Sequence, residues 1–194
     1  MAKKESTLWN MVLTLLVVSA VSSSSLSFIN QLTKEPKDVA EKVKQNFAIM
    51  AVLPDFDNNP SEEAYDIKCS DSDAFLTCYP AVKNGELTGI AVKTWTMKGF
   101  NGMVRLMVGF DITGNIINIS VLEQKETPGL GTKILDPEFK NQYIGKNPGS
   151  NNLYVKKDGG EIDAITAATI SSRSFSDAVQ RAYQSLEKAG KFEK

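Results

Sequence analysis

Two short segments of this 194-residue chain hold the residue types best suited to binding a ligand. The first, Glu126–Lys133, reads ETPGLGTK. Its proline fixes one backbone φ angle, and its two glycines permit backbone shapes and close approaches that other residues resist. The segment predicts a rigid loop whose backbone can lie against a flat ligand, with Leu130 as an apolar contact. An ordinary surface loop is the alternative.

The second segment, Asp163–Ser172, reads DAITAATISS and lies where the last helix of the chain is expected to begin. The start of a helix exposes unpaired N–H groups and the positive end of the helix dipole, so it favours a phosphate group. The alternative is a structural role, in which the hydroxyl of Thr166 or Ser171 caps the helix.

The composition excludes most other kinds of site. The chain has no histidine and two cysteines, which rules out Ser-His-Asp and Cys-His catalysis and every histidine-ligated metal site. A formal net charge of −1 also argues against a nucleic-acid partner, because such proteins usually carry a basic excess. We therefore expect any chemistry to come from a bound organic cofactor, with no metal and no catalytic side chain.

An apolar run near the N-terminus predicts a membrane anchor over residues 8–29. Leu8–Ile29 contains no charged side chain, and as a helix its 22 residues span roughly 33 Å, close to the hydrocarbon thickness of a bilayer. Trp9 lies at one end of the run and Phe28 at the other, and aromatic residues are typical of membrane boundaries.

Lys3 and Lys4 precede this run, so residues 1–7 are expected in the cytoplasm and the rest of the chain outside it. A cleaved signal peptide has the same basic start, and Ala20 lies among small residues that a peptidase accepts. A buried helix of a soluble protein is the third interpretation. The anchor and the signal peptide both imply that the bulk of the chain is exported.

Residues 30–60 are expected to form a linker helix. Apolar residues at spacings of three and four predict an amphipathic helix, with Pro36 in its first turn and Pro54 at its end. The residues of its apolar face are Val39, Val43, Phe47 and Met50.

Residues 61–194 are expected to form one α+β domain, in which helices pack on an antiparallel sheet. Asn84-Gly85 and Thr113–Asn115 predict two hairpin turns. The pattern predicts a final helix from about Thr169 to Ala189 with Gly190 as its C-cap. The expected strands are Leu76–Val82, Glu86–Trp95, Met103–Asp111, Ile116–Leu122 and Leu153–Lys157, and a short helix is expected over Pro137–Ile144.

Cys69 and Cys78 lie in the part that is expected to be exported. A pair of cysteines outside the cytosol often oxidises to a disulfide, and two buried free thiols are the alternative. A metal site that adds Asp71 and Asp73 is a third, weaker interpretation.

The two motifs together resemble the FMN-binding domain family of RnfG and NqrC proteins. ETPGLGTK, followed about thirty residues later by DAITAATISS, matches that family in order, spacing and the single preceding anchor. The similarity extends over KGFNGMVRLMVGFDITGNIINISVLEQ and covers about residues 60–190. Ala167 stands where the family more usually has glycine, and Gln124 where many relatives have histidine.

The resemblance implies a covalently bound flavin. In that family a flavin transferase joins FMN through a phosphoester to the last threonine of a [ST]-[GA]-A-T pattern. That residue is Thr169 here, preceded by Thr166, Ala167 and Ala168, with Asp163 matching an acidic residue ahead of them. The expected contacts from the first motif are Glu126, Thr127, Gly129, Leu130 and Gly131.

The resemblance also implies a place in a membrane complex. The chain is expected to be a redox subunit of an Rnf ion-translocating oxidoreductase in a bacterial inner membrane, with the A, B, C, D and E subunits as partners. It would relay electrons and bind neither ferredoxin nor NAD, and Arg105 is a candidate for stabilising the reduced flavin. The alternatives are an NqrC-type subunit of a Na⁺-translocating NADH-quinone reductase and an exported binding module without flavin.

Overall fold

The structure, a computed structural model, describes residues 7–192 and divides into two compact units, Met1–Val43 and Lys44–Lys194. The helix α1, Leu8–Val52, begins in the first unit and ends in the second. Within the described residues it is the one helix long and apolar enough to cross a membrane, with a mean hydropathy of 2.0 in its most apolar part, none of which is buried. The interpretation as a buried soluble helix is therefore wrong, and a single membrane anchor is supported.

The expected break between anchor and linker helix is absent from α1. Pro36 lies inside this continuous helix and does not begin a new one. The predicted apolar face is also wrong, because Phe47 and Met50 are more than half exposed and the buried residues are Ala48, Ile49 and Val52.

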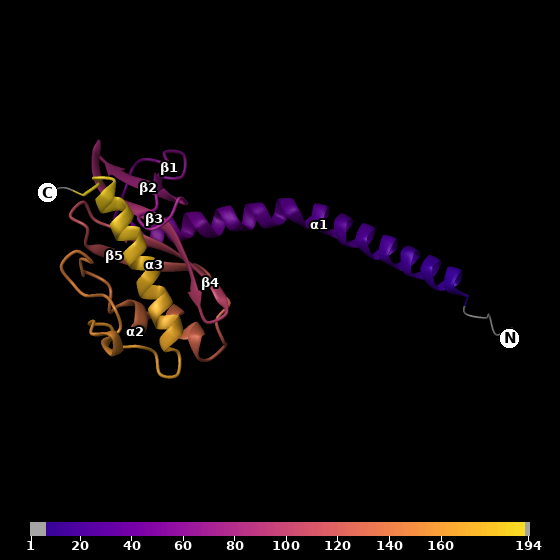
Figure 1. Ribbon diagram of the computed structural model, residues 1–194. Helices are drawn as coiled ribbons and strands as arrows, with labels where there is room; N and C mark the ends of the chain where they lie inside the picture. The colour runs from indigo at the N-terminus through magenta and orange to yellow at the C-terminus, as the bar shows by residue number, and fades with distance from the viewer. Residues whose placement is uncertain (1–6, 193–194) are drawn as a thin grey trace. The chain divides into compact units, whose positions relative to one another are not determined.

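The second unit is built on a five-stranded antiparallel sheet with strand order β1-β2-β3-β4-β5 (Figure 1). Each strand pairs with the next along the chain, so short turns connect most of them. At the β2–β3 turn Asn84 and Gly85 both have positive φ, as the hairpin prediction requires. The strands are β1 Tyr65–Lys68, β2 Phe75–Lys83, β3 Glu86–Gly99, β4 Gly102–Phe110 and β5 Ile116–Glu123.

Both faces of this sheet are covered. The long C-terminal helix α3, Thr169–Lys188, packs across one face (Figure 1), where Phe175 and Val179 meet the side chains of Leu106 and Val108 in the main core. The last turns of α1 cover the other face, where Val52 packs with Met107. Because both faces are buried, β4 is apolar almost throughout, and the predicted α+β class is confirmed.

Between β5 and α3 the chain forms short helical turns: η1 Gly131–Leu135, α2 Pro137–Lys140 and η2 Lys156–Asp158. The predicted strand over 153–157 is wrong, because Val155 forms only an isolated bridge with Ile162 before η2 begins. These turns place a cluster of aromatic rings under α3, with Tyr143 and Phe175 at a centroid distance of 5.0 Å.

The two cysteines are buried free thiols, so the disulfide alternative is not realised. Burial raises the pKa of the Cys78 thiol to about 12, which makes it an inert core residue. No cluster of metal-ligating side chains occurs among residues 7–192, and the metal site with Asp71 and Asp73 is not formed.

The C-terminal helix ends as the sequence predicts. Gly190 has a φ of +64°, and its N–H donates to the carbonyl of Glu187 at 2.9 Å. The N–H of Lys191 then donates to the carbonyl of Leu186, which completes a glycine cap.

Candidate functional site

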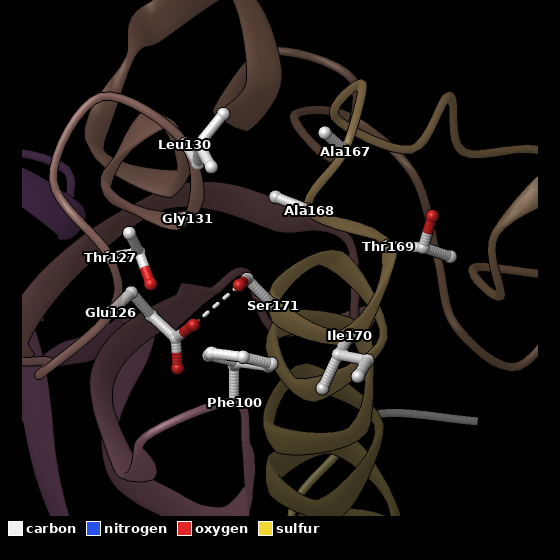
Figure 2. Close-up of a pocket in the computed structure, with 10 residues that line it drawn as sticks. All are labelled: Phe100, Glu126, Thr127, Leu130, Gly131, Ala167, Ala168, Thr169, Ile170 and Ser171. Carbon is white, nitrogen blue, oxygen red and sulfur yellow. Dashed lines mark hydrogen bonds between the residues drawn. The ribbon is translucent and has the colours of Figure 1, made fainter.

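The two motifs meet on a single pocket of about 300 Å³ (Figure 2). The ETPGLG loop forms one side, and the turn before α3 with the first residues of the helix forms the other. The lining residues are Phe100, Glu126, Thr127, Leu130, Gly131, Ala167, Ala168, Thr169, Ile170 and Ser171.

Local hydrogen bonds fix the shape of the loop. The carbonyl of Thr127 accepts from the N–H groups of Leu130 and Thr132 at 3.2 and 3.3 Å. The hydroxyl of Thr132 accepts from the N–H of Gly129, which has a φ of +75° in the left-handed region. The loop is therefore the rigid turn that its proline and glycines predict.

Gly131 brings this loop against α3. A Cβ atom placed on Gly131 would lie 2.6 Å from the hydroxyl oxygen of Ser171 and 2.8 Å from Cβ of Glu126. Only a residue without a side chain allows this approach, so the two glycines of the loop have different roles. Gly129 supplies a backbone angle, and Gly131 supplies space.

No side chain among residues 7–192 caps the start of α3. The N-cap residue is Ala168, and neither Thr166 nor Ser171 bonds to the first N–H groups of the helix. The hydroxyl of Ser171 instead donates to Oε2 of Glu126, and Ser172 bonds to the carbonyl of Ala168 and the N–H of Ile165. The capping alternative is therefore wrong, and the positive end of the helix dipole faces the pocket.

Glu126 is the buried acidic group of the site, with 4% of its surface exposed. Its Oε2 accepts from Ser171 at 2.5 Å, as the dashed line in Figure 2 shows, whereas its Oε1 has no hydrogen-bond partner in the described part of the chain. Its backbone N–H donates to the side chain of Gln124 at 2.6 Å. Gln124 thus holds the start of the loop.

Thr169 is the first residue of α3 and is partly buried. In Figure 2 its side chain points away from Glu126, to the other side of the helix start. There its hydroxyl oxygen lies 3.4 Å from Nζ of Lys157.

Most of the predicted site residues come together at this pocket, and three do not. Thr166 lines a neighbouring hollow with Asp163 and Gln142, and Gly129 shapes the loop without lining the pocket. Arg105 is also absent from the lining and pairs with Glu123 at 3.1 Å.

The sequence reasoning missed Phe100, which lies in the β3–β4 turn and is 62% exposed at the pocket. Its sequence context, a phenylalanine between Gly99 and Gly102, does not by itself mark a pocket residue. It also missed Ile170, which lies in the second motif but was not among the expected flavin contacts.

Ala167 adopts a φ of +61°, a left-handed conformation that costs a residue with a Cβ atom roughly 1 kcal/mol. Relief of this strain in the Ala167→Gly variant is therefore expected to raise the free energy of unfolding by about 0.5–1 kcal/mol. The greater chain entropy that glycine gives the unfolded state reduces this gain. Ala168→Gly, at a negative φ of −133°, is the matched control and should destabilise. Chemical denaturation of both variants measures the difference. An equal loss in the free energy of unfolding of the two variants would contradict the strain at Ala167.

Comparison with known proteins first defines the class of protein to which the chain belongs. Residues 99–184 match the family model described as the FMN-binding domain, and they include the whole pocket. The G subunit of an ion-translocating oxidoreductase complex from Vibrio vulnificus is 32% identical over 87% of this chain and 84% of its own length.

The chain belongs to the RnfG family, the G subunits of ion-translocating oxidoreductase complexes. A further relative, the G subunit of the Na(+)-translocating ferredoxin:NAD(+) oxidoreductase complex of Acetobacterium woodii, is 32% identical over 91% of each chain. Among solved structures, NqrC of Shewanella oneidensis aligns with a TM-score of 0.46 and 20% identity over 58% of each chain, a likeness too weak to add to the assignment.

Proposed function

We propose that this chain is the G subunit of a membrane-bound Rnf complex, a ferredoxin–NAD oxidoreductase that translocates ions, and that it carries one FMN joined through a phosphoester to Thr169. The observation that carries this proposal is the meeting of the ETPGLG loop and the TAAT turn on one pocket. The family of the chain supports the same conclusion.

The residues of the pocket fit a flavin. Phe100, Leu130 and Ile170 offer apolar surface to a flat ring, and Gly131 removes the side chain that would fill the space between loop and helix. Glu126 supplies a buried carboxylate with an oxygen that has no partner, which suits a ligand with N–H donors.

Each group of the chain then has a definite task. Thr169 provides the hydroxyl oxygen for attachment, and the turn at Ala167 and Ala168 presents it at the surface of the domain. Leu130 on the loop and Ile170 on the helix offer apolar surface from opposite sides of the pocket. The flavin, when bound, supplies the electron-transfer chemistry, and the protein supplies position and electrostatics.

The remaining parts of the proposal concern location and partners. The domain would lie outside the inner membrane, anchored by the apolar part of α1, with residues 1–7 in the cytoplasm. A flavin transferase would load it, and the A, B, C, D and E subunits of the Rnf complex would surround it. Covalent attachment has a physical reason there, because a dissociated cofactor would diffuse away from the cell.

The full chain, expressed in a bacterial membrane with a flavin transferase, tests this proposal. We expect flavin fluorescence that stays with the protein band on a denaturing gel, and Rnf subunits that co-purify in mild detergent. Co-purified subunits of a quinone reductase would assign the chain to the NqrC type instead. If the protein carries no flavin under these conditions, the remaining interpretation is an exported binding module without flavin.

The anchor helix is expected to contact other subunits. Ser23, Ser27 and Asn30 recur on one face of α1 at spacings of four and three, and small polar residues let membrane helices approach closely. Replacing the run Ser22–Ser25 with leucines should strengthen insertion but weaken assembly, measured as the yield of complex per anchored chain in a detergent pull-down.

The matched control replaces Ser22–Ser25 with alanines, which keep the helix face small, and should retain most of the complex. An undiminished complex with the leucine variant would show that the helix is only a tether. A mature protein that begins after Ala20 would show a cleaved signal peptide instead of an anchor.

A further inference from the structure

A lysine outside both motifs lies beside the proposed attachment point. Lys157 belongs to η2, and its Nζ lies 3.4 Å from the hydroxyl oxygen of Thr169. Lys157 is exposed, and it precedes Thr169 by twelve residues, so only the fold of the intervening segment brings the two together.

The acidic groups around Lys157 are engaged by other cations. Asp158 accepts two hydrogen bonds from the guanidinium of Arg173, both at 2.7 Å. These bonds hold the pKa of Asp158 below its usual range. Asp163 pairs with Lys156 at 2.7 Å. Lys157 also interacts electrostatically with Asp158, but Arg173 makes the hydrogen bonds to this carboxylate, and Nζ of Lys157 reaches the hydroxyl of Thr169.

The two ends of the site differ in charge. At the Thr169 end lie Lys157 and the helix start of α3, which no side chain caps. At the other end lies the buried carboxylate of Glu126, whose Oε1 has no partner. A phosphate group is attracted to the first end and repelled from the second, whereas an N–H donor of a ring is favoured at the second.

We infer that Lys157 is a phosphate-positioning residue of this site, and that Lys157 and Glu126 at its opposite ends fix the direction in which the flavin lies. The inference rests on the proposed attachment at Thr169 and adds a residue that neither motif contains. A phosphate joined to both Thr169 and riboflavin carries one negative charge, and the Lys157 ammonium group compensates it. Lys157 takes no part in forming the bond.

The test uses the full chain in detergent, prepared with FMN attached and, by expression without the transferase, without it. The thermal midpoint of both forms and the ³¹P resonance of the loaded form are measured. In the wild type we expect loading to raise the midpoint and the folded protein to shift the ³¹P resonance away from its position in the denatured chain.

Lys157→Met should lower the gain in midpoint on loading by about 1–4 °C and move the ³¹P resonance toward the denatured position. Lys157→Arg should restore both, because it keeps the charge. Lys188→Met, in the last turn of α3, removes the same charge at the far end of the helix and should change neither.

The outcomes separate this inference from the proposed function. A wild-type chain that carries no FMN on Thr169 would overturn both. A loaded Lys157→Met protein with the wild-type gain and the wild-type ³¹P resonance would overturn the role of Lys157 alone. An equal loss in the Lys157→Met and Lys188→Met proteins would also overturn it, since it would reflect net charge only.

Discussion

Thr169→Ala is expected to abolish covalent FMN while leaving the domain folded. Thr169 is the first residue of α3 and not its N-cap, and its hydroxyl contacts only the exposed Lys157 among the hydrogen bonds of the described residues. The loss in the free energy of unfolding should therefore stay within about 0.5 kcal/mol, below the cost of removing a true cap.

Peptide mass spectrometry of the chain loaded by a flavin transferase checks this expectation directly. Thr166→Ser is the matched control, because Thr166 lies in the same turn but lines the neighbouring hollow with Asp163, and serine keeps the [ST]-[GA]-A-T pattern. That variant is expected to retain FMN on Thr169. FMN found on Thr166, or retained by the Thr169→Ala protein, would contradict the assignment.

Sequence patterns predicted the elements whose cause is local. Asn84-Gly85 defines its hairpin through its own backbone angles, and Gly190 ends the last helix in the same way. The pattern of the last helix correctly predicted where α3 runs, and its residues Ala178, Val179 and Ala182 pack in the main core. In each case the residues that carry the pattern also make the structure.

The buried face of α1 has a distant cause that its own sequence does not contain. A Cβ atom on Gly109 of β4 would lie 1.9 Å from the carbonyl oxygen of Val52, so this glycine allows the end of α1 to lie directly on the sheet. That contact turns Ile49 and Val52 inward and leaves Phe47 exposed. Helical periodicity alone selected the wrong face.

The site shows the same division between local and distant causes. Its two motifs were recognisable from sequence, and the structure confirms that they lie together. Phe100 reaches the pocket from a β-turn, and Lys157 reaches Thr169 beside it from a short 3₁₀ helix. Neither residue has a period or spacing that relates it to Thr169, so only the three-dimensional packing could identify them.

Gly131→Val is expected to have the second large effect. It should separate the ETPGLG loop from α3. The new Cβ would overlap the hydroxyl oxygen of Ser171 and the side chain of Glu126, so the loop must move and the Glu126–Ser171 hydrogen bond must stretch. We expect a loss of about 1–3 kcal/mol in the free energy of unfolding. The visible spectrum and reduction potential of the attached flavin should also change.

Gly129→Val tests the other glycine by a different mechanism. A Cβ on Gly129 meets nothing within 4 Å, so this substitution acts only through the φ of +75°. Gly129→Asn should recover most of the lost stability, because asparagine tolerates left-handed angles, whereas Gly131→Asn should recover none. Covalent FMN should persist in all four proteins, since attachment depends on Thr169. If the flavin spectrum and potential of the Gly131→Val protein equal those of the wild type, the loop does not contact the cofactor, and Glu126 must then hold its buried charge for the fold alone.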